Sequence, residues 1–375
     1  MKVAIVCDFL TKLGGAQKVL MTLHELYPNA PIYCLLYSEK GTKGQFKDCH
    51  IIPSSLQKQP GFLRHRPKLL VGKFAKAVEE FDLSKYDVVI SSNDSYAHGV
   101  ITKPEIYHLC YCHTPTRYLW DWHVEYLAEN NLGYNLKGLF VRNLLHKQRI
   151  WDRVSADRVD HFVANSENVK HRIEKYYRRN SDVVYPPVEV ADIEMATEPP
   201  QDHYLIVSRL EPYKKIDLAI MACNKLKKKL IIVGDGSAKN HLQSIAGSTI
   251  EFTGWKDGEK LWQYFQNTKA FIFPGEEDFG ITVVEAMAAG RPVIAYKKGG
   301  ALESIINGLT GLFFSESSVK SLAEAILKLE KKYDSFTPKN CRQQAEKFSK
   351  EIFMTKIQAT IERGYKKHQE MMRNV

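Results

Sequence analysis

Residues 273–295 read FPGEEDFGITVVEAMAAGRPVIA, the pattern of a strand end, a glycine-containing turn, a helix and a following strand. Glu277 and Glu285 stand eight positions apart in it, slightly more than two helical turns, so both can border the same ligand. The helix start adds unpaired backbone N–H groups and the positive end of a dipole. These N–H groups belong to Phe279, Gly280 and Ile281. The stretch predicts a pocket for an anionic molecule rich in hydroxyl groups.

Two glutamates at this spacing can also be ordinary acidic residues at a helix N-terminus. Here the apolar strand AFIFP precedes them, and the small residues Ala288, Ala289 and Gly290 allow the helix to pack closely on a sheet. The run resembles the signature of retaining glycosyltransferases of family four, in which a nucleotide-sugar donor lies against the turn. The resemblance implies an α/β fold of the GT-B type, with two Rossmann-like doubly wound domains facing across a cleft.

The bulk composition is that of a globular protein with a basic surface. A chain of 375 residues suits two domains, and hydrophobic and charged fractions of 44% and 26% argue against extensive disorder. The net charge of +10 allows nucleic acid, anionic lipid or a phosphorylated substrate as partner. No RNA-binding signature, helix-turn-helix pattern or zinc-finger spacing is present, so we expect no nucleic-acid partner.

Targeting signals and cysteines indicate a cytoplasmic protein. No apolar run reaches the roughly 18 to 20 residues that span a bilayer, and the start MKVAIVCDF does not read as a signal peptide. The seven cysteines are scattered, which favours free, buried thiols in a reducing compartment. Cys110 and Cys112, with His108 and His113 nearby, could suggest a metal, but their spacing fits no usual zinc pattern.

Two series of alternating strands and helices divide the chain. The first runs through KVAIVCDF, PIYCLL, DVVISS, YHLCYC and HFVAN, and the second through YLIVSRL, KLIIVGDG, TIEFTG, AFIFP, PVIAY and GLFF. Between them, residues 181–202 are proline-rich and suit a semi-rigid connector. We predict an acceptor-side domain over residues 1–189 and a nucleotide-sugar-binding domain over 190–350. The resemblance implies a C-terminal helix, residues 351–375, that packs back on the first domain.

Gly14 and Gly15 lie between the first strand and a helix expected over Ala16–Leu26. Without side chains, they allow a phosphate to approach the helix N-terminus, although a merely tight connection is the alternative. No G-x-G-x-x-G is present, which argues against a dinucleotide cofactor. In the resemblance, this loop contacts the donor phosphate and helps to shape the acceptor side.

Arg209 and Lys214 lie in SRLEPYKKIDLAI, at a strand end and a helix start. A leaving nucleoside diphosphate develops negative charge, and fixed cations stabilise that charge most in the transition state. The pair matches the R-x4-K element of the resembled family, so we assign both to the diphosphate. Lys215 stands where the family usually has glycine, either as a further phosphate contact or as a surface lysine.

No D-x-D stands at a strand end, the usual arrangement that holds a divalent cation on a sugar nucleotide. Arg209 and Lys214 would take the place of the metal. The sequence therefore predicts activity without magnesium, no metal site and no cofactor besides the nucleotide-sugar substrate.

His113 ends the strand YHLCYC, where an imidazole could donate to a sugar hydroxyl, stabilise an oxocarbenium-like centre or be purely structural. The resemblance places a histidine here beside the donor sugar, and CHTPTRYLWD looks like the mannosyltransferase branch of O-antigen assembly. Asn93 and Asp94 end a neighbouring strand and are weaker candidates to face the same cleft.

The remaining roles follow from the resemblance. Glu285 would accept bonds from the ribose hydroxyls, and Glu277 would contact the transferred sugar. Asp278 departs from the family's usual glycine, which puts the shape of the sugar-facing loop in doubt. The backbone N–H groups of Phe279, Gly280 and Ile281 would hold the sugar hydroxyls and the phosphate. Gly234 would let the nucleotide approach, with a plain turn as the alternative, and Gly254 would lie near the base.

Two basic stretches suggest a lipid-linked acceptor. Residues 60–77 could rest among lipid headgroups, or form a core helix with a solvated basic face, and residues 170–180 add further cations. The first stretch interleaves Phe62, Leu63, Leu69, Leu70, Val71 and Phe74 with Arg64, Arg66, Lys68, Lys73 and Lys76. We expect peripheral contact with the inner face of an anionic cell membrane.

Together these features predict a retaining, metal-independent glycosyltransferase that moves mannose from GDP-mannose to a lipid-linked or growing surface polysaccharide. Retention by front-face attack is implied by the resemblance alone. A sugar-nucleotide epimerase of the same fold and a non-catalytic nucleotide-sugar-binding subunit are the alternatives.

Overall fold

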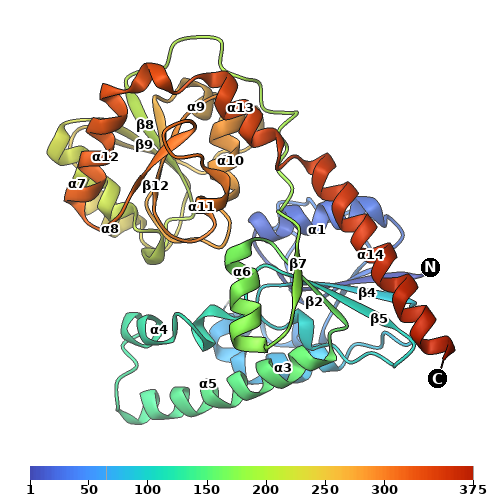
Figure 1. Ribbon diagram of the computed structural model, residues 1–375. Coiled ribbons are helices and arrows are strands. Elements are labelled where there is room, and N and C mark those ends of the chain that lie inside the picture. Colours follow the sequence, from blue (N-terminus) through green and yellow to red (C-terminus); the bar gives the residue numbers. More distant parts are fainter. Residues whose placement is uncertain (65, 375) are drawn as a thin grey trace. The chain divides into compact units, whose positions relative to one another are not determined.

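The computed structural model describes residues 1–64 and 66–374. The chain forms two compact units (Figure 1). Unit 1 comprises Met1–Tyr185 and Met354–Val375, and unit 2 comprises Pro186–Phe353. Two residues of the predicted segments, His65 in the stretch 60–77 and Val375 at the C-terminus, lie outside the described residues.

Unit 1 is built on a sheet of seven strands in its described part, in the order β3-β2-β1-β4-β5-β6-β7, with all neighbours parallel. This is a doubly wound order, and its direction reverses between β1 and β4. The strands are β1 (Val3–Leu10), β2 (Ile32–Tyr37), β3 (Ile51–Pro53), β4 (Val88–Asn93), β5 (Tyr107–Cys112), β6 (His161–Ala164) and β7 (Ser181–Val183).

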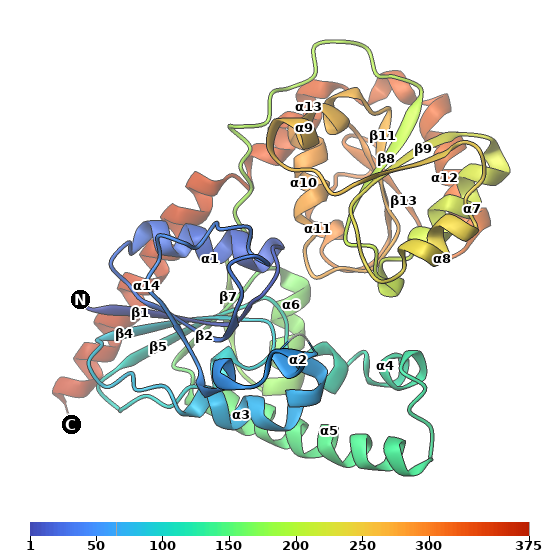
Figure 2. The same cartoon turned by 180° about the vertical axis from the view of Figure 1, so that it is seen from behind.

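Helices cover both faces of this sheet. Figures 1 and 2 show α1 on one face and α3 and α5 on the other. Phe74 and Val78 of α3 pack in one core cluster with Val6 and Val89 of the sheet. The helices are α1 (Gly15–Leu26), α2 (Gly61–Arg64), α3 (Val71–Glu79), α4 (His123–Glu129), α5 (Leu136–Ser155), α6 (Glu167–Arg172) and α14 (Lys350–Arg373).

Unit 2 repeats the design with a sheet of six strands in its described part, in the order β10-β9-β8-β11-β12-β13, again all parallel. The reversal lies between β8 and β11. The strands are β8 (His203–Val207), β9 (Lys229–Val233), β10 (Ile250–Gly254), β11 (Ala270–Phe273), β12 (Val293–Tyr296) and β13 (Gly311–Phe314).

The helices of unit 2 form two layers. Those on one face, α7 and α12, bury Ile220, Cys223 and Ile326 against the sheet residues Ile232 and Ile272. Figure 1 shows α9, α10 and α13 on the other face. The helices are α7 (Ile216–Leu226), α8 (Lys239–Ser244), α9 (Gly258–Asn267), α10 (Ile281–Ala288), α11 (Ala301–Ser304), α12 (Val319–Lys331) and α13 (Pro338–Glu346).

The predicted connector, residues 181–202, is packed in its first half and mostly exposed from residue 191 on. Val188, Val190 and Ile193 are buried, and the Val188 backbone N–H donates to the Phe348 carbonyl at 3.2 Å. Its proline-rich composition therefore does not produce a free linker on the unit 2 side. The predicted boundary at residues 189 and 190 lies inside this segment, and the units divide between Tyr185 and Pro186.

The α/β fold with two Rossmann-like domains is confirmed. All the strands predicted from apolar runs are present, because both faces of a parallel sheet are covered and its strands are apolar throughout. Two short strands, β3 and β7, were not predicted, since each has only three residues and lies at a sheet edge. Within the described residues, no helix combines the length and apolar character needed to cross a membrane.

Candidate active site

The strongest candidate site lies in unit 2, where the strand order reverses. Ligands of open parallel sheets bind beyond the carboxyl ends of the strands at such a point. The segment after β8 carries Arg209 and Lys214, and the loop after β11 carries Glu277. Because β8 and β11 are neighbours in the sheet, the topology brings these two sequence motifs together.

Lys214 and Glu277 form an ion pair between the lysine Nζ and the glutamate Oε1. Their side chains are only 16% and 18% exposed. They line a small cavity together with Ser208, Phe273 and Gly275. A cation and a carboxylate, both shielded from bulk water, therefore stand side by side where a charged ligand would bind.

The loop between β11 and α10 depends on two glycines. A Cβ at Gly275 would lie 3.0 Å from the carbonyl oxygen of Lys214, so glycine allows the loop to approach the lysine backbone. Gly280 has φ of +92°, and a Cβ there would lie 2.9 Å from the Phe273 ring. Asp278, where the resembled family usually has glycine, is not among the residues with positive φ, so an aspartate fits its backbone without strain.

Two glycines that sequence reasoning did not single out hold this loop in place. Gly299 and Gly300 follow β12, and a Cβ on either would lie 2.3 Å from the carbonyl oxygen of Glu277 or Asp278, respectively. The Gly300 N–H donates to the Glu277 carbonyl at 2.9 Å. The signal in the sequence was the pair Gly-Gly between a strand and a helix, the same kind of turn as Gly14 and Gly15 in unit 1.

Glu285 lies inside α10 and is 4% exposed, with Val284 and Ala286 buried on either side. A carboxylate so deeply buried requires polar partners, because its desolvation is costly. Gly280 and Ile281 stand at the start of this helix, where their N–H groups have no intrahelical acceptor. The two predicted glutamates therefore belong to one loop and helix, as the sequence indicated.

Arg209 is exposed, and its Nη2 donates to the hydroxyl of Tyr213 at 3.0 Å. The Lys214 Nζ lies 5.1 Å from the centroid of the same ring. Tyr213 thus contacts both predicted phosphate-binding cations. Sequence reasoning did not select it, because an aromatic residue between charged ones carries no signal of its own.

Lys215 has φ of +55° and ψ of 35°, the left-handed conformation, at the N-cap of α7. This explains why glycine suits the position, since a side chain is strained there. The Lys215 side chain is exposed.

Gly234 follows β9 and Gly254 ends β10, and the Gly234 N–H donates to the Gly254 carbonyl at 2.9 Å. A Cβ at Gly234 would lie 1.9 Å from the Ser208 carbonyl, so packing within the chain already requires glycine there. This favours the turn interpretation of Gly234. Gly254 differs: its φ is +72° and a Cβ would meet no atom within 4 Å, so it borders open space. Trp255 beside it is 43% exposed.

In unit 1, His113 follows β5 and is 9% exposed. Its Nε2 lies 2.8 Å from the Ser92 hydroxyl, and its backbone carbonyl accepts from Asn165 Nδ2 at 2.9 Å. Burial lowers the pKa of His113 to about 4, although the charge of Asp94 opposes this. The imidazole is therefore neutral near pH 7 and offers one donor and one acceptor.

Gly14 is the N-cap of α1 and Gly15 its first residue, so the helix begins one residue before the predicted Ala16. Gly14 has φ of −173°, an extended conformation open to any residue. The conformation alone therefore does not require glycine at residue 14.

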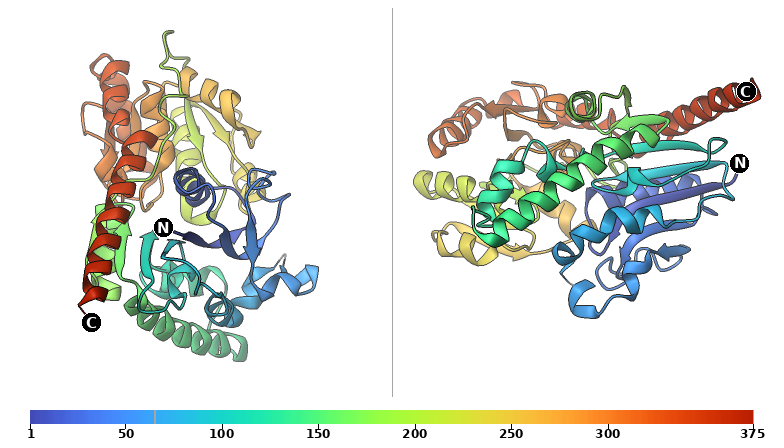
Figure 3. Two further views of the ribbon diagram at one scale, coloured as in Figure 1. Left: turned by 90° about the vertical axis from the view of Figure 1, so that its right-hand side faces the viewer. Right: turned by 90° about the horizontal axis from the view of Figure 1, so that it is seen from below.

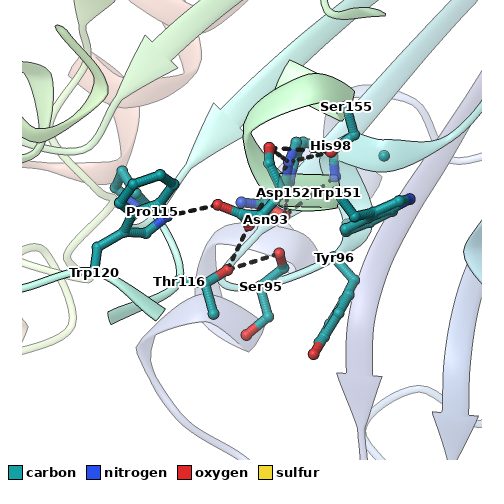
Figure 4. A network of polar contacts seen from close by, with 12 residues as sticks. Asn93, Ser95, Tyr96, His98, Pro115, Thr116, Trp120, Trp151, Asp152 and Ser155 are labelled. Carbon is teal, nitrogen blue, oxygen red and sulfur yellow. Dashed lines mark hydrogen bonds and ion pairs between the residues drawn. The ribbon is translucent and has the colours of Figure 1, made fainter. Parts of the chain in front are cut away.

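A buried polar network lies near the carboxyl ends of β4 and β5, and sequence reasoning missed it (Figure 4). The fully buried Asp152 accepts from Thr116 Oγ1 at 2.8 Å and from Trp120 Nε1 at 2.7 Å. The hydroxyl of Ser155 lies 2.9 Å from His98 Nε2. Burial raises the pKa of Asp152, and the neighbouring His98 and its hydrogen bonds oppose this. Burial lowers the pKa of His98.

Asn93 belongs to this network and not to a ligand surface. Its side chain is fully buried, and its Oδ1 accepts from the backbone N–H of His98 at 3.1 Å. The expectation that Asn93 faces the cleft is therefore wrong. The Asp94 N–H donates to the buried carboxylate of Asp8 on β1 at 2.7 Å, so the loop after β4 is fixed from within the sheet.

The cysteines are free thiols, and all except Cys49 are buried. Cys110 and Cys112 pack in an apolar cluster with Phe162. His108 is directed elsewhere, with its Nε2 2.9 Å from the Ser91 hydroxyl.

Part of the stretch 60–77 belongs to the core. Leu70 and Phe74 are 2% and 3% exposed within the core of unit 1, which for these two residues favours the core-helix alternative over contact with lipid. Phe62 and Leu69 are exposed, at 66% and 62%. In residues 170–180, Arg172 pairs with Asp121 at 3.2 Å.

Two family models match this chain. The model described as Glycosyltransferase Family 4 matches residues 13–192, and the model described as Glycosyl transferases group 1 matches residues 194–348. The second range contains the Lys214–Glu277 pair and Glu285.

Curated relatives match parts of the chain. An uncharacterized glycosyltransferase of Methanocaldococcus jannaschii is 26% identical over 196 residues, 51% of this chain and 55% of that protein. A GDP-mannose-dependent alpha-mannosyltransferase of Mycolicibacterium smegmatis is 34% identical over 174 residues, 43% of this chain and 46% of that protein. The chain thus matches about half the length of these relatives.

A solved structure matches along almost its whole length. Anabaena Alr3699/HepE in complex with UDP has a TM-score of 0.72 at 19% identity, covering 96% of this chain and 100% of that chain. The likeness shows the GT-B fold. Because the two family models together match residues 13–192 and 194–348, the chain belongs to the glycosyltransferases of the family-four and group-1 type.

Proposed function

We propose that the chain is a retaining, metal-independent glycosyltransferase that transfers mannose from GDP-mannose to a lipid-linked or growing surface polysaccharide. The observation that carries the proposal is the shielded pairing of Lys214 with Glu277 at the strand reversal of unit 2. This pair brings together a cationic and an acidic side chain, the two kinds of group that a diphospho-sugar site would need.

The cationic and the acidic residues would bind different parts of the donor. Arg209 and Lys214 would stabilise the negative charge that develops on the departing diphosphate. Glu277 would accept hydrogen bonds from hydroxyls of the transferred sugar, and Glu285 from those of the ribose. Before a donor binds, Lys214 neutralises Glu277, so an arriving diphosphate would share that lysine and leave the carboxylate oxygens available to the sugar.

His113 would act from unit 1 as a hydrogen-bonding group. Its lowered pKa keeps the ring neutral at pH 7, so it would donate to or accept from a sugar hydroxyl and would not serve as a fixed cation. In front-face attack, the leaving phosphate would take the proton of the acceptor hydroxyl, and no enzyme nucleophile would be needed.

The donor is inferred from relatives. A GDP-mannose-dependent alpha-mannosyltransferase is 34% identical over the matched stretch, whereas Anabaena Alr3699/HepE, also solved with UDP-glucose, is 18% identical. Because the second likeness concerns the fold alone, we favour GDP-mannose over UDP-glucose.

Donor hydrolysis tests the proposal. The protein is incubated with GDP-mannose and, separately, UDP-glucose, and products are followed by mass spectrometry. We expect slow release of mannose and GDP, unchanged by EDTA and absent in Glu277→Gln. A new sugar nucleotide would indicate an epimerase, no product from either donor a non-catalytic subunit, and EDTA sensitivity would refute metal independence.

The acceptor is tested with lipid diphosphate-linked glycans. Transfer of labelled mannose to such a glycan, with the product's anomeric configuration read by NMR, would support both the acceptor class and retention. Transfer only to free, water-soluble sugars would contradict the lipid-linked acceptor.

A further inference from the structure

The outer face of α5 is apolar and uncovered within unit 1. Leu136, Phe140, Ile150 and Val154 are 88%, 70%, 54% and 56% exposed. Their spacing places all four on one side of a helix with 3.6 residues per turn. Seen from below in Figure 3, α5 lies along the outside of unit 1.

The buried face of the same helix is mixed, because Leu145 packs in an apolar cluster with Leu119 and Leu127 while three polar residues are also buried. Gln148, Asp152 and Ser155 point inward, and Asp152 and Ser155 belong to the network of Figure 4. A surface helix of a globular protein normally keeps its apolar residues inside and its polar residues outside, and α5 has apolar residues on both sides. The apolar outer row is therefore not left over from core packing and calls for an external partner.

The turn before α5, residues 133–135, presents a further large side chain, and its backbone is held in place by hydrogen bonding and close packing. Tyr134 is 82% exposed and stacks under Arg142, whose guanidinium carbon lies 4.6 Å from the ring centroid. Asn135 caps α5 by accepting from the Gly138 N–H at 2.8 Å. A Cβ at Gly138 would lie 1.8 Å from the Gly133 carbonyl, so this tight turn depends on glycine.

The charged residues between Asn130 and Trp151 have one sign, and the first exposed acid beyond them, Asp157, pairs with Arg153 at 2.8 Å. Residues 130–151 contain lysines and arginines and no aspartate or glutamate. Lys137 and Lys147 are exposed. The nearest acid along the helix, Asp152, is buried. The α5 face, which we define as Tyr134, Leu136, Phe140, Ile150 and Val154 with Lys137 and Lys147, is thus apolar and basic.

The exposed part of the stretch 60–77 adjoins the α5 region. Lys68 Nζ donates to Asn130 Oδ1 at 3.0 Å, which ties that stretch to the end of α4. Phe62 and Leu69, which are exposed apolar residues of the stretch, belong to the neighbouring α2 and the 3₁₀ turn Pro67–Leu70.

We propose that the α5 face docks on a bilayer that contains anionic lipid. Exposed aromatic and aliphatic side chains beside lysines are the pattern of a helix lying in the headgroup region. A second copy of the chain fits less well, because a two-fold contact would bring the same lysines of both copies together. The inference deepens the proposed function, since it would place the enzyme beside a lipid-linked acceptor.

Vesicle sedimentation tests the surface. The full chain is mixed with vesicles of phosphatidylcholine, with or without phosphatidylglycerol. We expect binding that depends on phosphatidylglycerol. The double variant Leu136→Asn/Phe140→Asn should weaken it at least about tenfold, through loss of inserted apolar area. Lys137→Glu/Lys147→Glu should weaken it by more than about fivefold per lysine, because each lysine is also reversed in charge.

Matched variants on α12 of unit 2 serve as controls. Leu327→Asn replaces a leucine of 42% exposure, and Lys320→Glu/Lys328→Glu reverses two exposed lysines. We expect neither control to change vesicle binding. Unaltered binding of the α5 variants, or no binding by the natural sequence, would overturn the proposal.

Two further measurements separate the alternatives. Light scattering that shows a dimer, converted to monomer by Leu136→Asn/Phe140→Asn, would assign the face to a second copy and overturn membrane docking. Donor cleavage in solution should be unchanged in that variant. Vesicle binding by a protein that cleaves no donor would uphold the surface while refuting the proposed activity.

Discussion

At the scale of single residues, the site depends on Lys214 and Glu277. Each lies in a motif that is readable along the sequence, but their contact joins segments that follow two different strands. Because both side chains are largely shielded from water, removal of one partner leaves the other charge poorly solvated.

A double-mutant cycle measures this pairing. We expect Lys214→Met and Glu277→Gln each to destabilise unit 2, and the double variant to cost less than the sum, with a coupling of about 1–3 kcal/mol in urea unfolding. The exposed Arg153–Asp157 pair, at 2.8 Å, is the control and should show a coupling below about 0.5 kcal/mol. Equal couplings for the two pairs would show that shielding adds nothing.

Lys215 carries backbone strain that a glycine would relieve. Its φ of +55° is unfavourable for a residue with a Cβ, so Lys215→Gly should raise the free energy of unfolding by about 0.5–1 kcal/mol. Glu324→Gly, in the interior of α12, should instead lower it by about 1 kcal/mol. A loss of stability in Lys215→Gly would indicate that the lysine side chain makes a stabilising contact.

His113 links the stability of unit 1 to pH. Its pKa falls from 6.5 to about 4 on folding, because of burial, so the unfolded chain binds more protons between these values. The free energy of unfolding should therefore be highest above pH 6.5 and fall on acidification. At pH 5, this side chain should lower it by about 2 kcal/mol. Replacement by Gln should flatten the pH dependence of urea unfolding by that amount. An equally steep profile in His113→Gln would assign the effect to other groups.

At the scale of elements, α14 shows how one glycine can govern docking. Gly364 lies inside this 24-residue helix, where glycine is unfavourable. A Cβ there would lie 1.9 Å from the Tyr107 hydroxyl of β5, so glycine allows the helix to lie against the sheet of unit 1. The family resemblance implied the helix, but the reason for its glycine lies on a strand more than 200 positions earlier.

Gly364→Ala tests this contact. Although alanine favours an isolated helix, we expect the clash to loosen α14 and to speed amide exchange over residues 354–373. Gly72→Ala, in α3, is a matched control, because its Cβ would meet Leu144 at an ordinary 3.5 Å, and it should stabilise by up to about 1 kcal/mol. Unchanged exchange in Gly364→Ala would mean that Tyr107 moves aside at little cost.

At the scale of the whole molecule, the two units carry different parts of the proposed chemistry. The predicted phosphate and sugar ligands Arg209, Lys214, Glu277 and Glu285 all lie in unit 2, and His113 lies in unit 1. A nucleotide without its sugar should therefore bind to unit 2.

Nucleotide binding should stabilise the units unequally. With GDP at about 100 times its dissociation constant, we expect roughly 2.7 kcal/mol of added stability for unit 2, seen as slower amide exchange in β8 and β11. The β1 and β4 strands of unit 1 should change less. Equal protection by UDP would contradict the preference for guanine, and protection confined to unit 1 would contradict the site itself.

The strands, the two-domain α/β class and the motifs around Glu277 and Arg209 were predictable from the amino-acid sequence, because apolar runs and turn glycines are local features. The contact between Lys214 and Glu277 was not, since it depends on the neighbouring positions of β8 and β11 in the folded sheet. The tertiary structure likewise turned Asn93, Leu70 and Phe74 inward and the apolar row of α5 outward. Burial depends on what packs against a residue, and that is a property of distant segments.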